Sequence, residues 1–220
     1  MLACRTVIET GLRKSEVCNL NHSDWPSTAK IAKAIRHGRP FVTMRVRWTK
    51  GGRPRIIMLS THFAAMVREW LDERRGALDL AFEKRTGLQR SKRLFVSDSK
   101  MHEGTPISGP TLYHCFKKKV PGGPETWFPH FGRHFFACMF ILRGTSYDAR
   151  LRGMTLAGMG ADWVHDRGNF WLRIVQRQLG HLSEQTTEIY LRWLVTSSQF
   201  AEIAAGYHSV LDGEEPPHAP

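Results

Sequence analysis

Residues 179–193 read LGHLSEQTTEIYLRW and set a histidine and a tyrosine on either side of a short polar run. The pair Leu179-Gly180 is typical of a helix end, because glycine adopts the left-handed conformation that closes a helix. His181 follows at once, and Tyr190 comes nine positions later (190 − 181). This spacing can bring a tyrosine hydroxyl near a histidine, although an ordinary half-buried tyrosine on an amphipathic helix gives the same pattern.

A second polar group lies upstream in PHFGRHFFA, residues 129–137. His130 and Arg133 are three positions apart, so on a helix both side chains point to the same side. His130 and His134 have the spacing of a metal-binding pair, but no Glu follows His130 as in the zinc-protease motif and no third ligand is evident. We therefore expect no metal here. The apolar residues expected to pack inward are Phe131, Phe135, Phe136, Met139 and Phe140.

Near the N-terminus, residues 10–20 read TGLRKSEVCNL. Residues 1–9 allow only a short helix before the Thr-Gly pair, and apolar positions after it indicate a second helix with one buried side. Arg13 lies where this second helix begins. Glu16 is three residues further, about one helical turn, and is therefore placed to orient the Arg13 side chain.

Residues 41–59 predict a β-hairpin, because alternating apolar residues are followed by two glycines and a returning apolar run. The apolar residues of this alternation are Val42, Met44, Val46 and Trp48. A flexible turn gives a basic side chain the reach to contact a phosphate. The basic residues of the hairpin and its turn are Arg45, Arg47, Lys50, Arg53 and Arg55.

The remaining segments are mostly predicted to be helical. The expected helices span residues 61–75, 108–120, 170–178 and 197–211, with a short strand at 94–97 and an acidic, Pro-rich tail at 212–220. The second of these helices ends in Lys117, Lys118 and Lys119, which suit either a solvated helix end or a phosphate contact. Residues 144–169 contain several glycines and few helical cues, so we expect an insertion loop or a small subdomain there.

The composition points to a polyanionic partner. Lys plus Arg number 32 and Asp plus Glu 20, which gives a formal charge of +12 and a pI near 10.0. Solubility alone also accounts for excess charge, but scattered arginines favour a basic face that binds nucleic acid. The four cysteines form no C-x-x-C pair, which argues against a zinc ribbon or a disulfide scaffold and favours a cytoplasmic location. No apolar run reaches the roughly 18 residues of a membrane span.

In order, the arginine, lysine, His-x-x-Arg, Leu-Gly-His and tyrosine boxes resemble the catalytic domain of the tyrosine recombinases, the phage integrase family. The resemblance implies an α+β fold, mainly helical, with a small antiparallel hairpin. It assigns residues 1–196 to the catalytic domain and 197–220 to a C-terminal helix and tail. Two departures are expected: the helical core-binding domain that normally comes first is absent, and the 48 positions between Arg133 and His181 (181 − 133) suggest an insertion at about 144–169.

The resemblance also implies residue roles. The catalytic residues would be Arg13, Lys50, His130, Arg133, His181 and Tyr190, with Glu16 and His134 in support. Tyr190 would attack a DNA phosphate, His130 would take its proton, and Lys50, or failing it Arg53, would protonate the leaving 5′ oxygen. The two arginines would bind the phosphate, and no metal or cofactor would be required. Further DNA contacts are expected from Arg45, Arg47, Arg53, Arg55, Lys117, Lys118 and Lys119.

The implied activity is site-specific recombination of double-stranded DNA through a 3′-phosphotyrosyl link, with a tetramer acting on paired sites and no membrane association. Two other interpretations stay open at this point. One is a truncated, non-catalytic DNA-binding remnant, and the other is DNA relaxation of the type IB topoisomerase kind.

Overall fold

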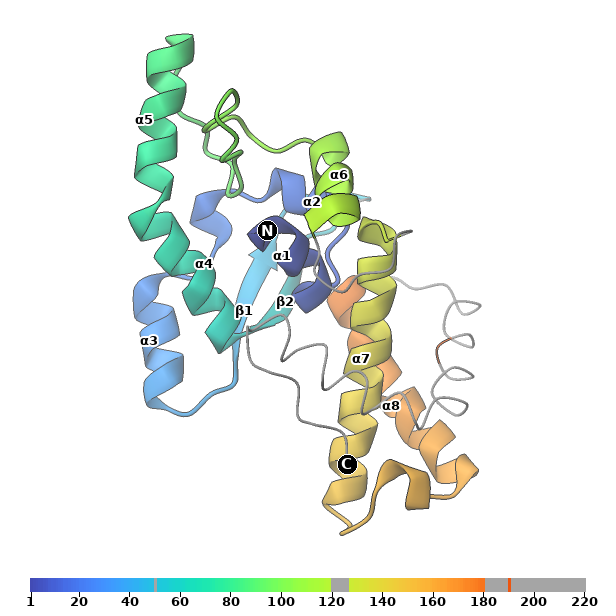
Figure 1. The fold of residues 1–220 in the computed structure, drawn as a ribbon. Coiled ribbons are helices and arrows are strands. Elements are labelled where there is room, and N and C mark those ends of the chain that lie inside the picture. Colours follow the sequence, from blue (N-terminus) through green and yellow to red (C-terminus); the bar gives the residue numbers. More distant parts are fainter. Residues whose placement is uncertain (50, 120–126, 181–189, 191–220) are drawn as a thin grey trace, which may run out of the picture.

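The computed structural model describes residues 1–49, 51–119, 127–180 and Tyr190 (Figure 1). The predicted α+β class, mainly helical with one antiparallel hairpin, is confirmed. Lys50, His181 and the helix expected at 197–211 lie outside the described residues. The helices are α1 (Leu2–Thr10), α2 (Lys14–Asn19), α3 (Thr28–Arg36), α4 (Thr61–Glu73), α5 (Arg75–Thr86), α6 (Gly109–Lys119), α7 (Pro129–Arg150) and α8 (Ala161–Leu179). The strands are β1 (Phe41–Val46) and β2 (Arg55–Ser60), and two short 3₁₀ turns are η1 (His22–Asp24) and η2 (Leu156–Gly158).

The hairpin has the predicted alternation over β1, where Val42, Met44 and Val46 are buried. Trp48 continues this alternation in the sequence, but it lies beyond the strand and is 60% exposed. The reason lies in the opposite strand. In the observed register Val46 lies opposite Arg55, so the next residue of the first strand, Arg47, would have to pair with Pro54. Proline has no N–H to donate, so the ladder ends before Trp48.

The apolar core has two parts, which α1 helps to join. One part gathers α1, the hairpin and α4 around side chains such as Val7 and Phe63. The other lies between α7 and α8, around Leu142 and Val175. In Figure 1, α1 lies between the hairpin and the long helix α7, and α1 and α7 are in contact. One central region, between the two parts of the core, therefore brings together three segments: the first turn of α2, strand β2 and the end of α8.

Most of residues 144–169 do not form the expected insertion loop, and the alternative of a small subdomain stays a prediction. Helix α7 runs through Gly144 to Arg150, and α8 begins at Ala161, so only residues 151–160 connect them, with η2 in the middle. The glycines in this segment suggested a loop, but Gly144 lies within α7 and allows α8 to pack closely against it. A Cβ at that position would lie 2.5 Å from Cε2 of Trp171 on α8. Whether the segment is an insertion relative to the family stays a prediction.

Other elements differ in smaller ways. The helix predicted at 108–120 corresponds to α6, and the one at 61–75 to α4, after which the chain continues directly into α5. The strand expected at 94–97 does not form. Instead, isolated bridges join Asn21 to Arg93 and Val96 to Pro106. The helix expected at 170–178 is the last part of α8, which ends at the predicted Leu-Gly stop with Gly180 in the left-handed conformation (φ 63°).

Candidate active site

Arg13 and Glu16 form the first part of the site at the beginning of α2. Arg13 is the N-cap, and its backbone N–H donates to Glu16 Oε2 at 2.8 Å, while its Nη1 donates to Oε1 at 3.3 Å. This is the contact that the three-residue spacing predicts, and a supporting role of Glu16 in catalysis stays a prediction. Glu16 is only 1% exposed, so its charge must be matched by donors inside the protein.

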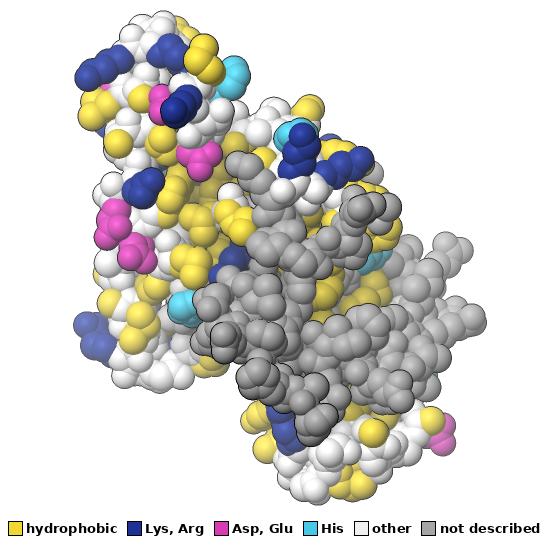
Figure 2. Space-filling view, in the orientation of Figure 1, with side chains coloured by type: hydrophobic (Ala, Val, Ile, Leu, Met, Phe, Trp, Pro, Cys, Tyr) yellow, Lys and Arg dark blue, Asp and Glu magenta, His cyan; other side chains and the backbone are white. Residues whose placement is uncertain are grey.

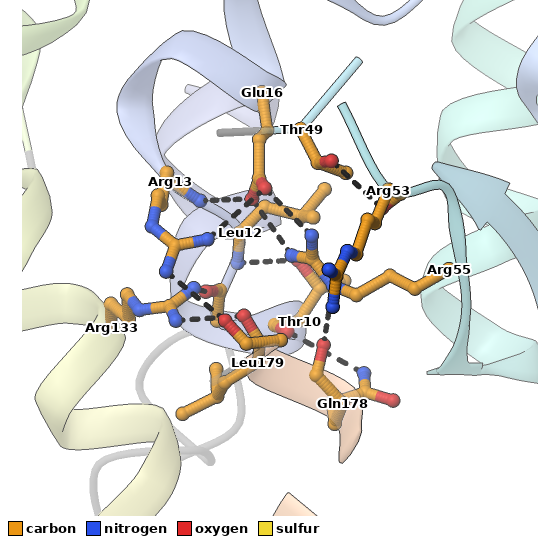
Figure 3. Close-up of polar contacts among 12 residues, drawn as sticks. Thr10, Leu12, Arg13, Glu16, Thr49, Arg53, Arg55, Arg133, Gln178 and Leu179 are labelled. Atoms are coloured by element: carbon orange, nitrogen blue, oxygen red, sulfur yellow. Dashed lines mark hydrogen bonds and ion pairs between the residues drawn. The ribbon is translucent and has the colours of Figure 1, made fainter. Parts of the chain in front are cut away.

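Arg55 supplies most of that match. Its Nη1 and Nη2 donate to the two carboxylate oxygens of Glu16 at 2.7 and 2.8 Å (Figure 3). Two parallel, charge-assisted bonds are the strongest geometry available to an arginine–carboxylate pair. Burial raises the pKa of Glu16, but the hydrogen bonds from Arg55 and from the Arg13 backbone outweigh it, so the net pKa is lowered. The prediction of Arg55 as a DNA contact is wrong, because its guanidinium is largely buried against Glu16.

The C-terminal end of α8 lies against three arginines. Backbone carbonyls at a helix C-terminus carry partial negative charge and lack helical partners, so cations stabilise them. Three consecutive carbonyls each accept from a different arginine: Gln178 O from Arg55 Nε at 2.9 Å, Leu179 O from Arg133 Nη2 at 2.8 Å, and Gly180 O from Arg13 Nη2 at 3.1 Å. We call these six residues the arginine clamp.

The clamp fixes the position of the C-terminal end of α8. Gln178 adds a further tie, because its amide Nε2 donates to Met58 O at 2.7 Å and its Oε1 accepts from Met58 N at 2.8 Å. Sequence reasoning did not predict a role for Gln178. A single glutamine before a helix stop carries no signal by itself, since the partner lies on the hairpin 120 positions away.

Arg133 is the most buried of the three clamp arginines. It lies on α7, and its Nη1 donates to Gly11 O at 2.6 Å in addition to the clamp bond. Burial, and then the nearby charge of Arg13, lower the pKa of Arg133 to about 10, so it is still protonated at neutral pH. Arg13 and Arg133 both line one cavity of about 380 Å³. The two predicted phosphate-binding arginines are therefore brought together.

Tyr190 meets the site through His134, one turn after His130 on α7. The hydroxyl of Tyr190 and Nδ1 of His134 share a hydrogen bond, and Nε2 of His134 lies 2.9 Å from Nε2 of His130. The hydroxyl thus contacts His134 rather than His130, and the predicted role of His130 as proton acceptor stays a prediction. Burial raises the pKa of Tyr190, and burial followed by the charges of His130 and Arg133 lowers the pKa of His134.

The inward-facing set on α7 is only partly as predicted. Phe136 and Met139 are buried, and Phe135 and Phe140 are half-buried. Phe131 is 43% exposed, so its predicted burial is wrong. It lies in the first turn of α7, where its ring packs on that of Phe128 with centroids 4.4 Å apart.

The other predicted DNA-contact side chains that the structure describes are on the surface. Arg47 is exposed and pairs with Asp24 at 3.0 Å, and the Lys119 side chain lies outside the described residues. Their contact with DNA stays a prediction. The exposed residues of this set are Arg45, Arg47, Arg53, Lys117 and Lys118.

Two further observations concern the described part of the chain. Within it, no group of three His, Cys, Asp or Glu side chains is arranged to hold a metal ion, and no helix is long and apolar enough to cross a membrane. All four cysteines lie in this part and are free thiols.

Comparison with known proteins gives the site a family. The profile of the phage integrase family matches residues 2–149, about two thirds of the chain. The chain belongs to the phage integrase family. The tyrosine recombinase XerA of Pyrococcus furiosus is 28% identical over 193 residues, which are 88% of this chain and 49% of that protein. The chain thus spans about half the length of this relative.

Two solved structures of this family have the same fold. The crystal structure of XerA recombinase matches with a TM-score of 0.52 and 21% identity over 91% of this chain and 57% of that one. The XerH site-specific recombinase, in a post-cleavage complex with its palindromic difH substrate, matches with a TM-score of 0.51 and 18% identity over 94% of this chain and 45% of that one. The integrase fold therefore extends over most of the chain.

Proposed function

We propose that this chain is the DNA-cutting and rejoining part of a site-specific recombinase, with Tyr190 as the nucleophile. The observation that carries the proposal is the hydrogen bond between Tyr190 and His134, on the same helix as Arg133 and beside the cavity that Arg13 also lines. A tyrosine, an imidazole pair and two arginines are the groups that phosphoryl transfer to a hydroxyl needs.

The chemistry begins with an acid that is too weak. A tyrosine hydroxyl has an ordinary pKa near 10, so its phenolate lies about 3 units, roughly 4 kcal/mol, uphill at pH 7. Burial raises the pKa of Tyr190 further. A proton acceptor must therefore act as the attack develops, and guanidinium groups must hold the negative phosphate that replaces the phenolate charge.

We assign the acceptor to His134, with His130 behind it. The hydroxyl proton passes from Tyr190 to Nδ1 of His134, and the proton on Nε2 of His134 passes to Nε2 of His130. This assignment requires His134 to be neutral beforehand, and its lowered pKa favours the neutral form at pH 7. His130 is exposed and can return the proton to solvent.

In the full reaction, the bond between Tyr190 and phosphorus forms as the bond to the 5′ oxygen breaks. The family resemblance assigns protonation of that oxygen to Lys50 and a further phosphate hydrogen bond to His181. The 3′-phosphotyrosyl link conserves the bond energy, so a second 5′-hydroxyl end can reverse the step without ATP or a cofactor. Arg13 and Arg133 retain N–H groups beyond those that bind backbone carbonyls, and these would hold the phosphate oxygens.

The proposed partners are double-stranded DNA and further copies of the chain, in a tetramer on paired sites. The net charge of +12 supports the first. A XerH relative has been captured with its difH DNA after cleavage, and that behaviour is proposed here for residues 1–196. We also propose a cytoplasmic location, which the four free thiols support.

A suicide-substrate assay tests this function. Nicked or 5′-bridging phosphorothiolate duplexes, made from the junctions that flank the gene, trap the covalent intermediate for detection on a denaturing gel. We expect an adduct with the wild type and with Tyr147→Phe, an exposed tyrosine of α7, and none with Tyr190→Phe. DNA binding without any adduct would instead support a non-catalytic remnant, and plasmid relaxation without recombinants would support a topoisomerase.

A further inference from the structure

Three aromatic rings form a partly exposed row beside the clamp arginines. Tyr113 of α6 and Phe128, the N-cap of α7, have ring centroids 6.0 Å apart at an interplanar angle of 26°. Phe131 continues the row from Phe128. Tyr113 is 38% exposed, and Lys117 Nζ lies 5.5 Å from the centre of its ring. We call Tyr113, Phe128 and Phe131 the aromatic row.

Two rings of the row, Tyr113 and Phe128, line the same cavity as Arg13 and Arg133. The wall of this cavity, about 380 Å³ in volume, includes both cationic side chains and aromatic rings. Its lining residues include Arg13, Lys14, His130, Arg133, Tyr113 and Phe128. A ligand that fills this volume therefore presents an anion and a flat apolar face close to each other, which is the chemistry of a nucleotide.

A purely structural role does not account for the whole arrangement. The stacking of Tyr113 on Phe128 helps to join α6 to α7, but this contact needs only one face of each ring. Tyr113 and Phe131 each keep more than a third of their surface exposed, and Lys117 lies beside the Tyr113 ring. Figure 2 shows Lys and Arg side chains in the region of α6, close to exposed hydrophobic atoms. Cations beside exposed aromatic rings suit single-stranded nucleic acid.

We propose that the aromatic row is a stacking site for an unpaired nucleobase next to the phosphate held by Arg13 and Arg133. The inference rests on the proposed function, which makes unpaired bases obligatory. After cleavage, the strand with the free 5′ end must leave its complement before another strand can be joined in its place. A base released from its stack loses its neighbours, and an aromatic side chain restores that contact with little dependence on sequence.

Single-stranded probes test the site without knowledge of the target sequence. The probes are a ten-residue oligothymidylate and the same backbone with tetrahydrofuran abasic residues, both compared at one salt concentration because phosphate contacts depend on salt. Stacking of one base on an aromatic ring strengthens binding by roughly ten- to hundredfold. We expect the wild type and Tyr113→Phe to prefer the base-bearing probe by that factor, and Tyr113→Ser to lose most of the preference.

The control is Tyr147→Ser, which removes an exposed tyrosine of α7 that lies outside the row. Thermal unfolding of each variant confirms that it is folded. Equal affinity of the wild type for the two probes, or an equal loss in Tyr147→Ser, would overturn the stacking site. Adduct formation through Tyr190 is measured on the same preparations, so a failure of the proposed function is seen separately from a failure of this inference.

Discussion

Replacing Glu16 by Gln is expected to destabilise the fold strongly, because this carboxylate joins α2 to β2. Its two oxygens accept from Nη1 and Nη2 of Arg55 and from the backbone and side chain of Arg13. Glutamine has nearly the same shape but no charge, and its amide NH₂ would point at one of these donors. The substitution therefore leaves a largely buried Arg55 charge without its partner.

The magnitude follows from the burial. Removing one partner of a buried ion pair costs about 3–5 kcal/mol, because the other charge stays buried and uncompensated. The lower limit applies here, since glutamine still offers one acceptor, so we expect a loss of about 3 kcal/mol. For a domain of this size, each kcal/mol lowers Tm by about 2–4 °C, which gives a shift of about 6–12 °C.

The assay is thermal and urea unfolding of Glu16→Gln beside Asp72→Asn. Asp72 pairs with Arg68 at 2.7 Å on the exposed side of α4, where a surface ion pair contributes at most about 1 kcal/mol. The two variants remove the same charge from opposite environments. A Tm shift in Glu16→Gln no larger than that in Asp72→Asn would refute the importance of the buried pair.

The pH dependence gives a second check on the same variant. Because the pKa of Glu16 is lowered in the folded state, its stabilisation is present above the ordinary value of 4.5 and is lost as the pH falls through the folded pKa. The stability difference between wild type and Glu16→Gln should therefore be full at pH 7 and narrow below pH 4.5. A difference that widens on acidification would contradict the sign of this shift.

Three further predictions concern packing and proton transfer. Gly11→Ala should lower the free energy of unfolding, measured with urea, by roughly 2–5 kcal/mol, because its φ is +67° and the added Cβ would meet two core side chains. The control Gly38→Ala, with φ +61° and open space around the Cβ, should lower it by only about 1–2 kcal/mol. Equal losses in the two variants would be inconsistent with crowding at Gly11. Gly144→Ala should lower Tm although alanine favours helices, because a tryptophan ring packs against this glycine. Gly76→Ala in α5, where the added Cβ meets open space, should instead raise Tm slightly. A rise of Tm in both variants would argue against the close α7–α8 contact. The pKa of His134 is lowered from 6.5, so the single-turnover rate of adduct formation should stay level from pH 8 to about pH 6.5 and fall only at lower pH. A decline of this rate centred above pH 7 would exclude His134 as the proton acceptor.

The elements that could be predicted are those with a strong local signal. The alternation in β1, the Arg13-to-Glu16 spacing and the Leu-Gly end of α8 are all visible within a few residues, and the structure has each of them. The loop expected at residues 144–169 was wrong for most of that range, because the sequence alone does not distinguish a glycine that permits close helix packing from a glycine in a loop. Only the position of Trp171 on the facing helix distinguishes the two.

The site shows the same limit. Arg55 follows two glycines in a basic turn, so the sequence suggests a solvent-facing cation, and nothing nearby in sequence indicates that Glu16 lies opposite it. Likewise, the box at residues 129–137 contains two histidines one helical turn apart, and the family resemblance favoured His130. Which of the two histidines contacts Tyr190 depends on where this tyrosine packs against α7, and that is a property of the tertiary structure.

The most direct test of the central claim is to locate the covalent link itself. The adduct trapped on a suicide substrate is digested with nuclease and protease, and mass spectrometry finds the residue that carries the nucleotide. The chain has four tyrosines: Tyr113, Tyr147, Tyr190 and Tyr207. We predict that the phosphodiester maps to Tyr190, whose hydroxyl already contacts His134. A link to any of the other three, or to a serine or cysteine, would contradict this account.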